Sequence, residues 1–203
     1  MSSVIYMAEN EEVTGVMRKS REAAAESNAR ITQAASRLVR ARGFEATGVA
    51  DVMQAAGMTN GGFYRHFESK NDMVSAAIRA AFDELVARFD HRLEQNGAAA
   101  AIDAYVTDYL SDWHLLHPEQ GCPVAAVGAD AGRSGGAFAD QFVEGAERLI
   151  RRLATGSGDE AGTRTDRDEA IRRLAALVGA VVVARAVGPG DLREEILAAC
   201  RAS

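Results

Sequence analysis

The sequence predicts an all-α protein, because helical patterns dominate it and strand patterns are essentially absent. Alanine-rich amphipathic segments recur along the chain, and proline occurs only at positions 118, 123 and 189. The one cluster of β-branched residues, LVGAVVVARAV, lies within a helical pattern and is therefore predicted as helix. With 203 residues, 47% of them hydrophobic, the chain can bury one good core or two modest ones.

Most predicted helix boundaries follow from glycine or proline. An apolar face that includes Ile31, Leu38 and Val39 predicts the first helix, and Gly43 ends it. Gly57 stops the second helix, and Pro123 begins a later one, since proline suits the first helical position. The predicted helices cover about 21–42, 49–56, 60–67, 71–94, 99–117, 123–131, 136–154, 167–187 and 192–201.

Three parts are expected along the chain: a flexible N-terminal arm at 1–20, a small helical domain at 21–70 and a larger helical domain at 71–203. The sequence from Met17 onward reads like a natural chain start, so the residues before it are expected to carry little structural weight. Residues 155–166, TGSGDEAGTRTD, are glycine-rich and charged and are expected to form a mobile loop.

The distribution of charge separates the two domains. The whole chain has a net charge of −6, but residues 18–70 hold nine basic and five acidic residues, a net charge of +4. Residues 71–203 hold fourteen basic and twenty-one acidic residues, a net charge of −7. A small basic domain on an acidic body is expected when one end of a molecule meets phosphates. The run Arg18, Lys19 and Arg21 is either a solvated charge run or an arm for a minor groove.

The sequence also indicates the cellular location of the protein. No apolar run approaches the roughly 20 residues that a membrane-spanning helix needs. The N-terminal stretch MSSVIYMAENEEVTG lacks the basic and apolar regions of a secretory signal. Cys122 and Cys200 are the two cysteines, too few for a disulfide framework. We therefore expect a cytoplasmic protein without a membrane partner.

The segment GVADVMQAAGMTNGGFYRHF (48–67) has the spacing of two short helices joined by a tight turn. Gly57 can adopt the positive φ that ends the first helix, and Met58 is the apolar residue of the turn. Thr59 is a good N-cap for the second helix, and Phe63 and Phe67 are expected in the core. This is the spacing of a helix-turn-helix, in which the second helix enters a major groove.

Residues 28–75 resemble the DNA-binding domain of the TetR family of transcriptional regulators. The resemblance is carried by ARGFEAT, AAGMTNGGFYRHF and SKNDM, whereas the rest of the chain matches the family only in length and helical character. It implies an N-terminal three-helix helix-turn-helix domain followed by a C-terminal helical domain that binds ligands and dimerises. No enzymatic activity and no cofactor are implied.

The resemblance also implies contact residues. Tyr64 and His66 would contact the DNA backbone, and Lys70 would meet a phosphate beside the start of the next helix, where free N–H groups add an anion site. Asn60 could bond adenine, and Arg65 could reach guanine or a phosphate. The full set of predicted DNA-binding residues is Gly48, Ala50, Thr59, Asn60, Gly61, Gly62, Tyr64, Arg65, His66 and Lys70.

Two of these positions depart from the family's pattern. Gly48 stands where the family usually has a serine or threonine cap, and glycine caps less well. Ala50 stands where many relatives have arginine or another polar residue, so it offers only an apolar contact. Base readout by the second helix is therefore expected to be sparse.

Cys122 is the most informative residue of the C-terminal domain. It directly precedes Pro123, so we expect it at a helix N-cap, where the helix dipole would stabilise a thiolate that senses oxidants or electrophiles. The alternative is a small, inert buried cysteine. His114 and His117 could share a helical face near Cys122, but their spacing is loose, and no metal site is predicted.

Two further sets of residues are expected to have a role in the C-terminal domain. The first set either lines an apolar ligand cavity or forms core: Phe82, Phe89, Tyr105, Tyr109, Trp113, Cys122, Phe138 and Phe142. The second set is expected to pack against a second copy of the chain in a four-helix contact: Leu174, Leu177, Val178, Val181 and Val182.

Together these features predict a homodimeric regulator that binds double-stranded DNA at a pseudo-palindromic operator. It is expected to act as a repressor, released by a small-molecule effector or by thiol modification. Two alternatives stay open. A helical enzyme would need an organised catalytic group, and an all-α interaction module would leave the Tyr64, His66 and Lys70 cluster unexplained.

Overall fold

The structure is a computed structural model that describes residues 2–154 and 164–201, with side chains from 21 to 154 and from 166 to 201. The secondary structure of these residues is entirely helical, which confirms the predicted fold class. The helices are α1 (Ser2–Arg42), α2 (Val49–Ala55), the 3₁₀ helix η1 (Asn60–Arg65), α3 (Lys70–Asn96), α4 (Ala98–Tyr109), α5 (Asp112–Leu116), the 3₁₀ helix η2 (Pro118–Gln120), α6 (Pro123–Ser134), α7 (Gly136–Ala154), α8 (Arg164–Val187) and α9 (Asp191–Arg201).

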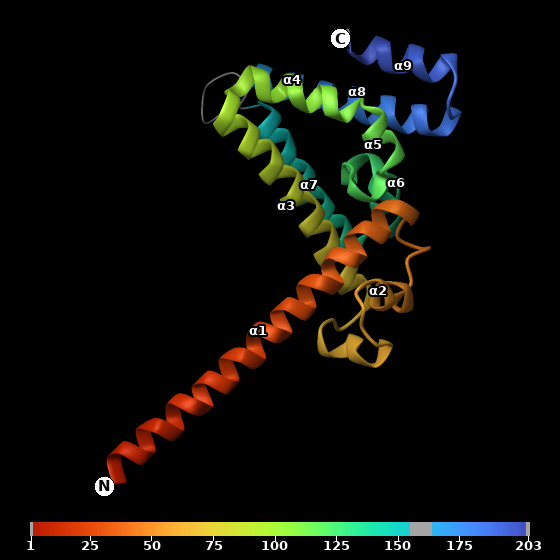
Figure 1. Cartoon of the computed structure of the whole chain (residues 1–203). Helices are drawn as coiled ribbons and strands as arrows, with labels where there is room; N and C mark the ends of the chain where they lie inside the picture. Colours follow the sequence, from red (N-terminus) through yellow and green to blue (C-terminus); the bar gives the residue numbers. More distant parts are fainter. Residues whose placement is uncertain (1, 155–163, 202–203) are drawn as a thin grey trace.

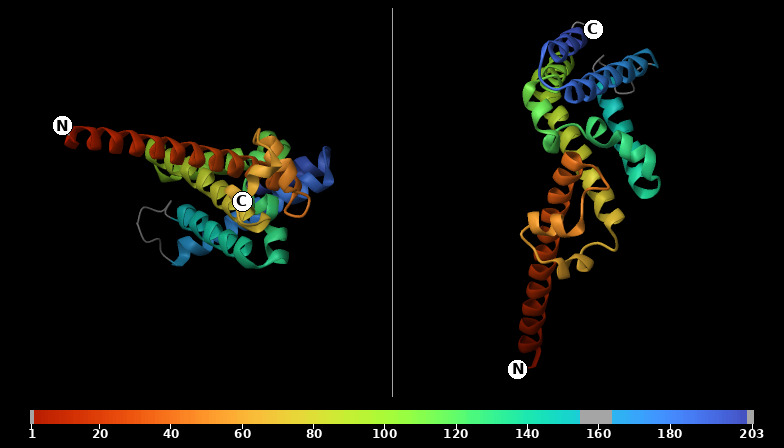
Figure 2. Two further views of the ribbon diagram at one scale, coloured as in Figure 1. Left: turned by 90° about the horizontal axis from the view of Figure 1, so that it is seen from below. Right: turned by 90° about the vertical axis from the view of Figure 1, so that its right-hand side faces the viewer.

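Helix α1 is much longer than predicted. It begins at Ser2 rather than near Arg21, so the segment expected as a flexible arm is helical from Ser2 onward. Its first half projects away from the rest of the molecule in all views (Figures 1 and 2). The physical reason is that residues 2–20 contain many helix formers and no proline, and the single Gly15 costs only about 1 kcal/mol.

The remaining helices form an elongated body. Helix α3 packs most extensively against α7 and against the second half of α1. Helices α8 and α9 lie at one end of the body, and α2 and η1 lie at the opposite end (Figure 1). The two predicted functional regions are therefore far apart along the molecule, and α3 runs between them.

Two predicted helices differ in form. The helix expected at 99–117 is divided into α4 and α5, because the Ser111 hydroxyl accepts a hydrogen bond from the His114 N–H at 3.2 Å and begins a new helix. The helix expected at 60–67 is the 3₁₀ helix η1, in which adjacent glycines weaken the preference for α-helical geometry. Of the loop expected at 155–166, residues 155–163 lie outside the described residues, and 164–166 begin α8.

The buried side chains form two clusters that α3 connects. The N-terminal core consists of residues from α1, α2, η1 and the first half of α3, together with Val127, Ala131 and Phe138 from α6 and α7. The C-terminal core consists of residues from the second half of α3, from α4 and α5 and from α7 to α9, together with Leu110 and Cys122. Because α6 and α7 contribute to the N-terminal core, the two expected domains share buried contacts rather than meeting at an exposed linker.

Helices α3 and α7 approach each other closely at Gly145. A Cβ atom on Gly145 would lie 2.1 Å from Cδ2 of Phe82, whose side chain is fully buried. An ion pair of 2.6 Å between Arg148 and Asp83 joins the same two helices at the surface. The position therefore requires glycine for packing rather than for backbone conformation.

The residues predicted for the dimer contact mostly face the interior of their own chain, so this assignment was wrong for the majority of them. Leu174, Leu177 and Val181 are buried in the C-terminal core, and Val178 is half-buried against it. Val182 is 45% exposed. Helix α8 is apolar on two sides, and a sequence pattern cannot say which apolar side faces the protein's own core.

Candidate functional site

Helix α2 and η1 are joined by the tight turn that the sequence predicted. Gly57 has a φ of +68° and ends the first element, and the Met58 N–H donates to the Met53 carbonyl at 2.8 Å. Phe63 and Phe67 are buried, with ring centroids 6.0 Å apart. These two side chains anchor η1 to the N-terminal core, as expected.

Helix α1 holds this turn through an arginine that the sequence did not indicate. The Arg30 guanidinium donates to the carbonyl of Ala56, the C-cap residue of α2, at 2.5 Å. A cation suits a helix C-terminus, because the unpaired carbonyls there carry partial negative charge. A Cβ on Gly57 would lie 3.3 Å from the same guanidinium, so the turn and Arg30 fit closely.

The outer face of η1 is exposed to solvent and is not covered by other described parts of the chain. Tyr64 is 80% exposed and packs edge-on against the Phe63 ring at 5.1 Å. Asn60 and Gly61 are exposed, and a Cβ on Gly61 would meet no described atom within 4 Å. A flat molecular surface, such as a groove edge or a phosphate backbone, could therefore approach the η1 backbone directly.

Neither α2 nor η1 begins with a side-chain cap. Thr59 precedes η1, but its side chain makes no capping bond there, contrary to prediction. The reason is the 3₁₀ winding, in which the Gly62 N–H already donates to the Thr59 carbonyl at 3.0 Å. Gly48 precedes α2 without a side-chain cap, and Ala50 is exposed on its first turn.

Arg65 and His66 border a shallow groove along α1, together with Asn28 and Arg37. Arg65 is exposed, whereas His66 is half-buried, and its carbonyl accepts from the Asn28 side chain at 3.4 Å. The predicted contact residues are thus divided between the outer face of η1 and the side that faces α1. Tyr64 belongs to the outer face.

Lys70 is held in place at the start of α3. Its ammonium donates to the Glu45 carbonyl at 3.3 Å and lies 4.7 Å from the centroid of the Phe44 ring. The anion site expected beside it is partly filled, because the Ser69 hydroxyl accepts from the Asp72 N–H at 3.1 Å. Lys70 is therefore the principal positive group at this helix end.

An anchored second element with a bare outer face, joined by a tight turn to a first element, defines a helix-turn-helix DNA-binding domain. Residues 31–77 match the family described as bacterial regulatory proteins, tetR family. The N-terminal domain of this chain belongs to the TetR family, which confirms the resemblance seen in the sequence.

Curated relatives support the same class. An uncharacterized HTH-type transcriptional regulator of Mycobacterium tuberculosis is 30% identical over 104 residues, which are 51% of this chain and 52% of that relative. The HTH-type transcriptional repressor KstR2 of Rhodococcus jostii is 35% identical over 74 residues, 36% of each chain. The chain thus matches about half or less of the length of these relatives, and both are named as regulators rather than enzymes.

A solved structure extends the comparison to the C-terminal helices. The reduced form of NemR from Escherichia coli has a TM-score of 0.71 at 21% identity, over 86% of this chain and 95% of the NemR chain. At this identity the likeness shows the fold. Of the described residues, no helix is long and apolar enough to cross a membrane.

The C-terminal domain contains a cavity of about 330 Å³ beneath α4 and α5. Some predicted ligand residues line it, whereas Phe82, Phe138 and Phe142 pack elsewhere, around the N-terminal core. Helical spacing could not separate these groups, because both are apolar faces. The lining residues are Leu85, Arg88, Phe89, Arg92, Tyr105, Asp108, Tyr109, Ser111, Trp113, His114, Gln120, Gly121 and Cys122.

Cys122 occupies the N-cap of α6, with Pro123 at the first helical position, as the sequence predicted. The expected thiolate is not favoured, because burial raises the pKa of the Cys122 thiol above its ordinary value. Hydrogen bonds to the thiol and the Arg40 charge oppose this effect without outweighing it. The buried-cysteine interpretation is therefore the one that the structure supports.

His114 holds the loop before α6 against α5. The Cys122 N–H donates to Nε2 at 3.0 Å, so the proton of the neutral ring lies on Nδ1, which donates to the Tyr109 carbonyl at 2.6 Å. A Cβ on Gly121 would lie 2.5 Å from Nε2, so this contact requires glycine. Within the described part of the chain, His114, His117 and Cys122 form no metal-binding group.

The lowered pKa of His114 predicts how the stability of the protein depends on pH. Burial lowers its pKa below the ordinary value, and protonation would abolish the acceptor for the Cys122 N–H. Below about pH 6.5 the unfolded chain therefore binds more protons than the folded chain. The stabilisation by neutral His114 is complete above that pH and is lost as the pH falls through the lower pKa of the folded state. Wild type should lose more stability between about pH 8 and about pH 5 than His114→Gln does, as measured by urea unfolding.

His117→Gln is the matched control, since His117 lies on the same segment and is bonded to the Trp113 carbonyl at 2.8 Å. It should retain the pH dependence of wild type. Equal pH dependence of His114→Gln and wild type would contradict the assignment.

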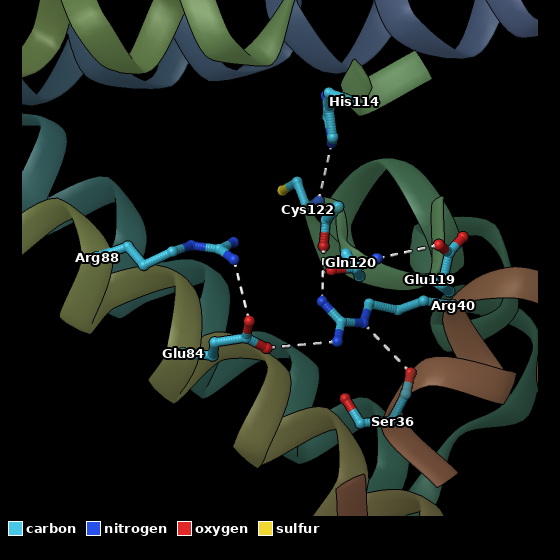
Figure 3. A network of polar contacts seen from close by, with 9 residues as sticks. Ser36, Arg40, Glu84, Arg88, His114, Glu119, Gln120 and Cys122 are labelled. Carbon is cyan, nitrogen blue, oxygen red and sulfur yellow. Dashed lines mark hydrogen bonds and ion pairs between the residues drawn. The ribbon is translucent and has the colours of Figure 1, made fainter. Parts of the chain in front are cut away.

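Arg40 connects the cavity to the DNA-binding domain (Figure 3). It lies on α1, is 4% exposed, and donates to the Gly121 carbonyl at 2.9 Å, directly before Cys122. It also donates to the Ser36 carbonyl at 3.2 Å and contacts the Glu84 carboxylate at 3.5 Å. Burial lowers the pKa of Arg40, and the Glu84 charge opposes this shift. One buried guanidinium thus joins α1, α3 and the wall of the cavity.

The far end of α6 makes a second connection. The Asp130 carboxylate accepts from the Phe44 N–H at 3.1 Å, in the loop between α1 and α2. The Phe44 ring stacks on Phe138 with centroids 5.2 Å apart. Helix α6 therefore touches the cavity at one end and the DNA-binding domain at the other.

Proposed function

We propose that this protein is a homodimeric transcriptional regulator that binds a pseudo-palindromic DNA operator, acts as a repressor and is released by a small molecule in the cavity. The observation that carries DNA binding is the outer face of η1, where Tyr64 is 80% exposed on an element anchored by buried phenylalanines. A phenol there and the ammonium of Lys70 are both donors for phosphate oxygens. The repressor assignment is supported by KstR2, a relative named as a repressor.

Effector release would act through α6. A ligand can shift the protein only if it binds two conformations with different affinity. Displacement of the cavity wall at Cys122 would move both connections to the DNA-binding domain, the Arg40–Gly121 bond and the Asp130–Phe44 bond. We assign release to reversible binding rather than thiol modification, because burial and a raised pKa disfavour the reactive thiolate of Cys122.

The dimer contact would use the apolar side of α8 and α9 that the chain's own core leaves uncovered. Val182 and Val183 are each 45% exposed, Val187 is 42% exposed and Leu192 is 56% exposed. A second copy of the chain is the occupant that fits the two half-sites of a pseudo-palindrome.

DNA binding is tested by fluorescence anisotropy with labelled duplexes from the region upstream of the protein's own gene, over a series of salt concentrations. Tyr64→Ala is expected to weaken binding about tenfold, since it removes one phosphate contact. Lys70→Ala is expected to weaken binding similarly and to reduce the salt slope by about one. Two chains should bind to each operator, one on each half-site.

Val143→Ala is the matched control, because Val143 is 67% exposed on α7, outside the helix-turn-helix. It should bind DNA like wild type. Absence of salt-dependent binding, or full affinity in Tyr64→Ala, would overturn the proposal.

A further inference from the structure

One wall of the cavity is formed by a single face of α3. Leu85, Arg88, Phe89 and Arg92 follow the helical spacing of three and four residues, and all four line the cavity. The side chain of Arg88 is 44% exposed and that of Arg92 is 31% exposed, so both guanidinium groups remain accessible from solvent. This wall therefore presents two cations beside an apolar surface.

Arg88 shares its carboxylate partner with a second arginine. It forms an ion pair of 3.0 Å with one oxygen of Glu84, and the other oxygen of Glu84 lies 3.5 Å from the buried Arg40 guanidinium. Figure 3 shows the two arginines reaching Glu84 from different directions. Arg88 can therefore turn from Glu84 to a ligand without leaving Glu84 unpaired, and it is the unpaired charge that is costly.

The cavity lining and the groups bonded to it carry an excess of positive charge. Arg92 is paired with Asp108 on the lining itself. Arg185 of α8 donates to the His114 and Leu115 carbonyls at 2.6 and 3.2 Å, and within the described residues it forms no ion pair. The four guanidinium groups and three carboxylates of this set are Arg40, Arg88, Arg92 and Arg185 with Glu84, Asp108 and Glu119, the last bonded to the Gln120 amide. A ligand with one negative charge would balance the excess.

The neutral groups at the cavity do not cancel this excess. Burial lowers the pKa of His114, and the charges of Arg185 and Arg88 act in the same direction, so the ring is neutral near pH 7. Burial raises the pKa of the Cys122 thiol, which stays neutral as well. The positive charge of Arg88 thus reaches into the cavity and meets no thiolate there.

The apolar part of the lining is largely aromatic. Phe89 packs edge-on against Tyr105 with ring centroids 5.8 Å apart, and Trp113 lines the cavity with 51% of its surface exposed. Aromatic side chains accommodate another ring through stacked and edge-to-face contacts. The cavity volume of about 330 Å³ is at the small end of ligand pockets, which favours a ligand with a single ring.

We propose that this cavity binds an aromatic carboxylate with one negative charge, whose carboxylate pairs with Arg88 and whose ring packs against Phe89 and Trp113. A planar guanidinium can donate two parallel hydrogen bonds to a carboxylate, which makes such a pair both strong and directional. The proposal rests on the proposed function, in which the occupant of this cavity is the effector, and it names the chemical class of that effector.

The test uses phenylacetate as the probe, phenylacetamide as the uncharged analogue of the same shape, and acetate as the carboxylate without a ring. Calorimetry measures binding to the full-length protein, and the fluorescence of Trp113, the single tryptophan of the chain, is the second measurement. Wild type is expected to bind phenylacetate at least about tenfold more tightly than either analogue. The affinity for phenylacetate should fall as salt rises, whereas the affinity for phenylacetamide should not.

Arg88→Met removes the charge and keeps an apolar stem. It is expected to weaken phenylacetate binding about tenfold or more and to leave phenylacetamide binding unchanged, and Arg88→Lys should retain part of the affinity. Arg79→Met is the matched control, because Arg79 is exposed on the same helix, lies outside the lining and is bonded to the Gln141 side chain at 2.7 Å. It should bind both probes like wild type.

Glu84→Gln changes the charge in the opposite direction, because it removes the carboxylate that Arg88 and Arg40 share. It is expected to strengthen phenylacetate binding about two- to fivefold and to leave phenylacetamide binding unchanged. If the ion pairs only maintained the shape of the cavity, both variants would weaken both probes, and that result would overturn the proposal.

Equal affinity for phenylacetate and phenylacetamide, no binding of phenylacetate, or unchanged phenylacetate binding in Arg88→Met would also overturn it. If Arg88→Met does not fold, Glu84→Gln and the salt series still decide the question. Anisotropy with operator DNA on the same preparation separates the two ideas. DNA binding without phenylacetate binding refutes only the ligand class, whereas phenylacetate binding that depends on Arg88, without DNA binding, refutes only the proposed function.

Discussion

An Arg40→Met variant is expected to lose about 3 kcal/mol of its free energy of unfolding. The guanidinium is buried and donates to the Gly121 and Ser36 carbonyls while it contacts the Glu84 carboxylate. Methionine keeps the apolar stem but leaves the Gly121 carbonyl without this donor, and an unsatisfied buried acceptor costs about 1–3 kcal/mol. The Glu84 carboxylate is half exposed and is also paired with Arg88, so its share of the loss is smaller.

Urea unfolding of Arg40→Met, Arg40→Lys and Arg37→Met measures this effect. Lysine is expected to recover only part of the stability, because an ammonium cannot reproduce the planar fork of donors. Arg37→Met is the matched control on the same helix, since Arg37 is exposed. It should change stability by less than about 0.5 kcal/mol. A loss in Arg40→Met no greater than in Arg37→Met would contradict the role of Arg40.

The same variants bear on the proposed release. If Arg40 carries the coupling, then a saturating ligand of the cavity, with occupancy followed by Trp113 fluorescence, should weaken DNA binding less in Arg40→Lys than in wild type, at a temperature where both are folded. An equal effect of the ligand in both proteins would assign the coupling to another route, such as the Asp130–Phe44 contact.

The second large effect is expected at Gly145. A Gly145→Ala variant should lose at least about 2 kcal/mol of its free energy of unfolding, even though alanine gains about 1 kcal/mol in helix propensity. The new Cβ would lie 2.1 Å from Cδ2 of the fully buried Phe82 ring, so α3 and α7 must separate. The effect is predicted to appear in both stability and DNA binding, because α3 contributes to both cores.

Gly132→Ala provides the matched control. Gly132 lies in α6, is exposed, and a Cβ there would meet no described atom within 4 Å. This variant should be more stable than wild type by up to about 1 kcal/mol in thermal or urea unfolding. A stable Gly145→Ala variant, or equal changes at the two glycines, would show that α3 and α7 are not closely packed at this point.

The helix-turn-helix could be predicted because its determinants are local. Gly57 supplies the positive φ of the turn, Met58 the apolar turn residue, and Phe63 and Phe67 the anchoring side chains, all within a few residues of one another. Local backbone preferences and short-range spacing are visible in a sequence. The sequence did not predict that η1 is a 3₁₀ helix rather than an α-helix. The two forms differ little in energy, and two adjacent glycines favour neither strongly.

The cavity was predicted only in part. Tyr105, Tyr109, Trp113 and Cys122 were expected to line a site and do so, whereas Phe82 packs into the N-terminal core. An apolar residue at helical spacing can face a cavity, the chain's own core or a partner, and the pattern is the same in each case. The same ambiguity misplaced the dimer residues on α8.

By itself, the sequence determined that this chain is helical, that residues 28–75 form a DNA-binding domain of the TetR type, and that Cys122 begins a helix. These properties depend on neighbours along the chain. Only the tertiary structure decided that Arg40 meets Gly121, that Cys122 is buried and neutral, and that the Asp130 carboxylate accepts from the Phe44 N–H. Such contacts join residues far apart in sequence, and their burial and charge depend on how whole helices pack.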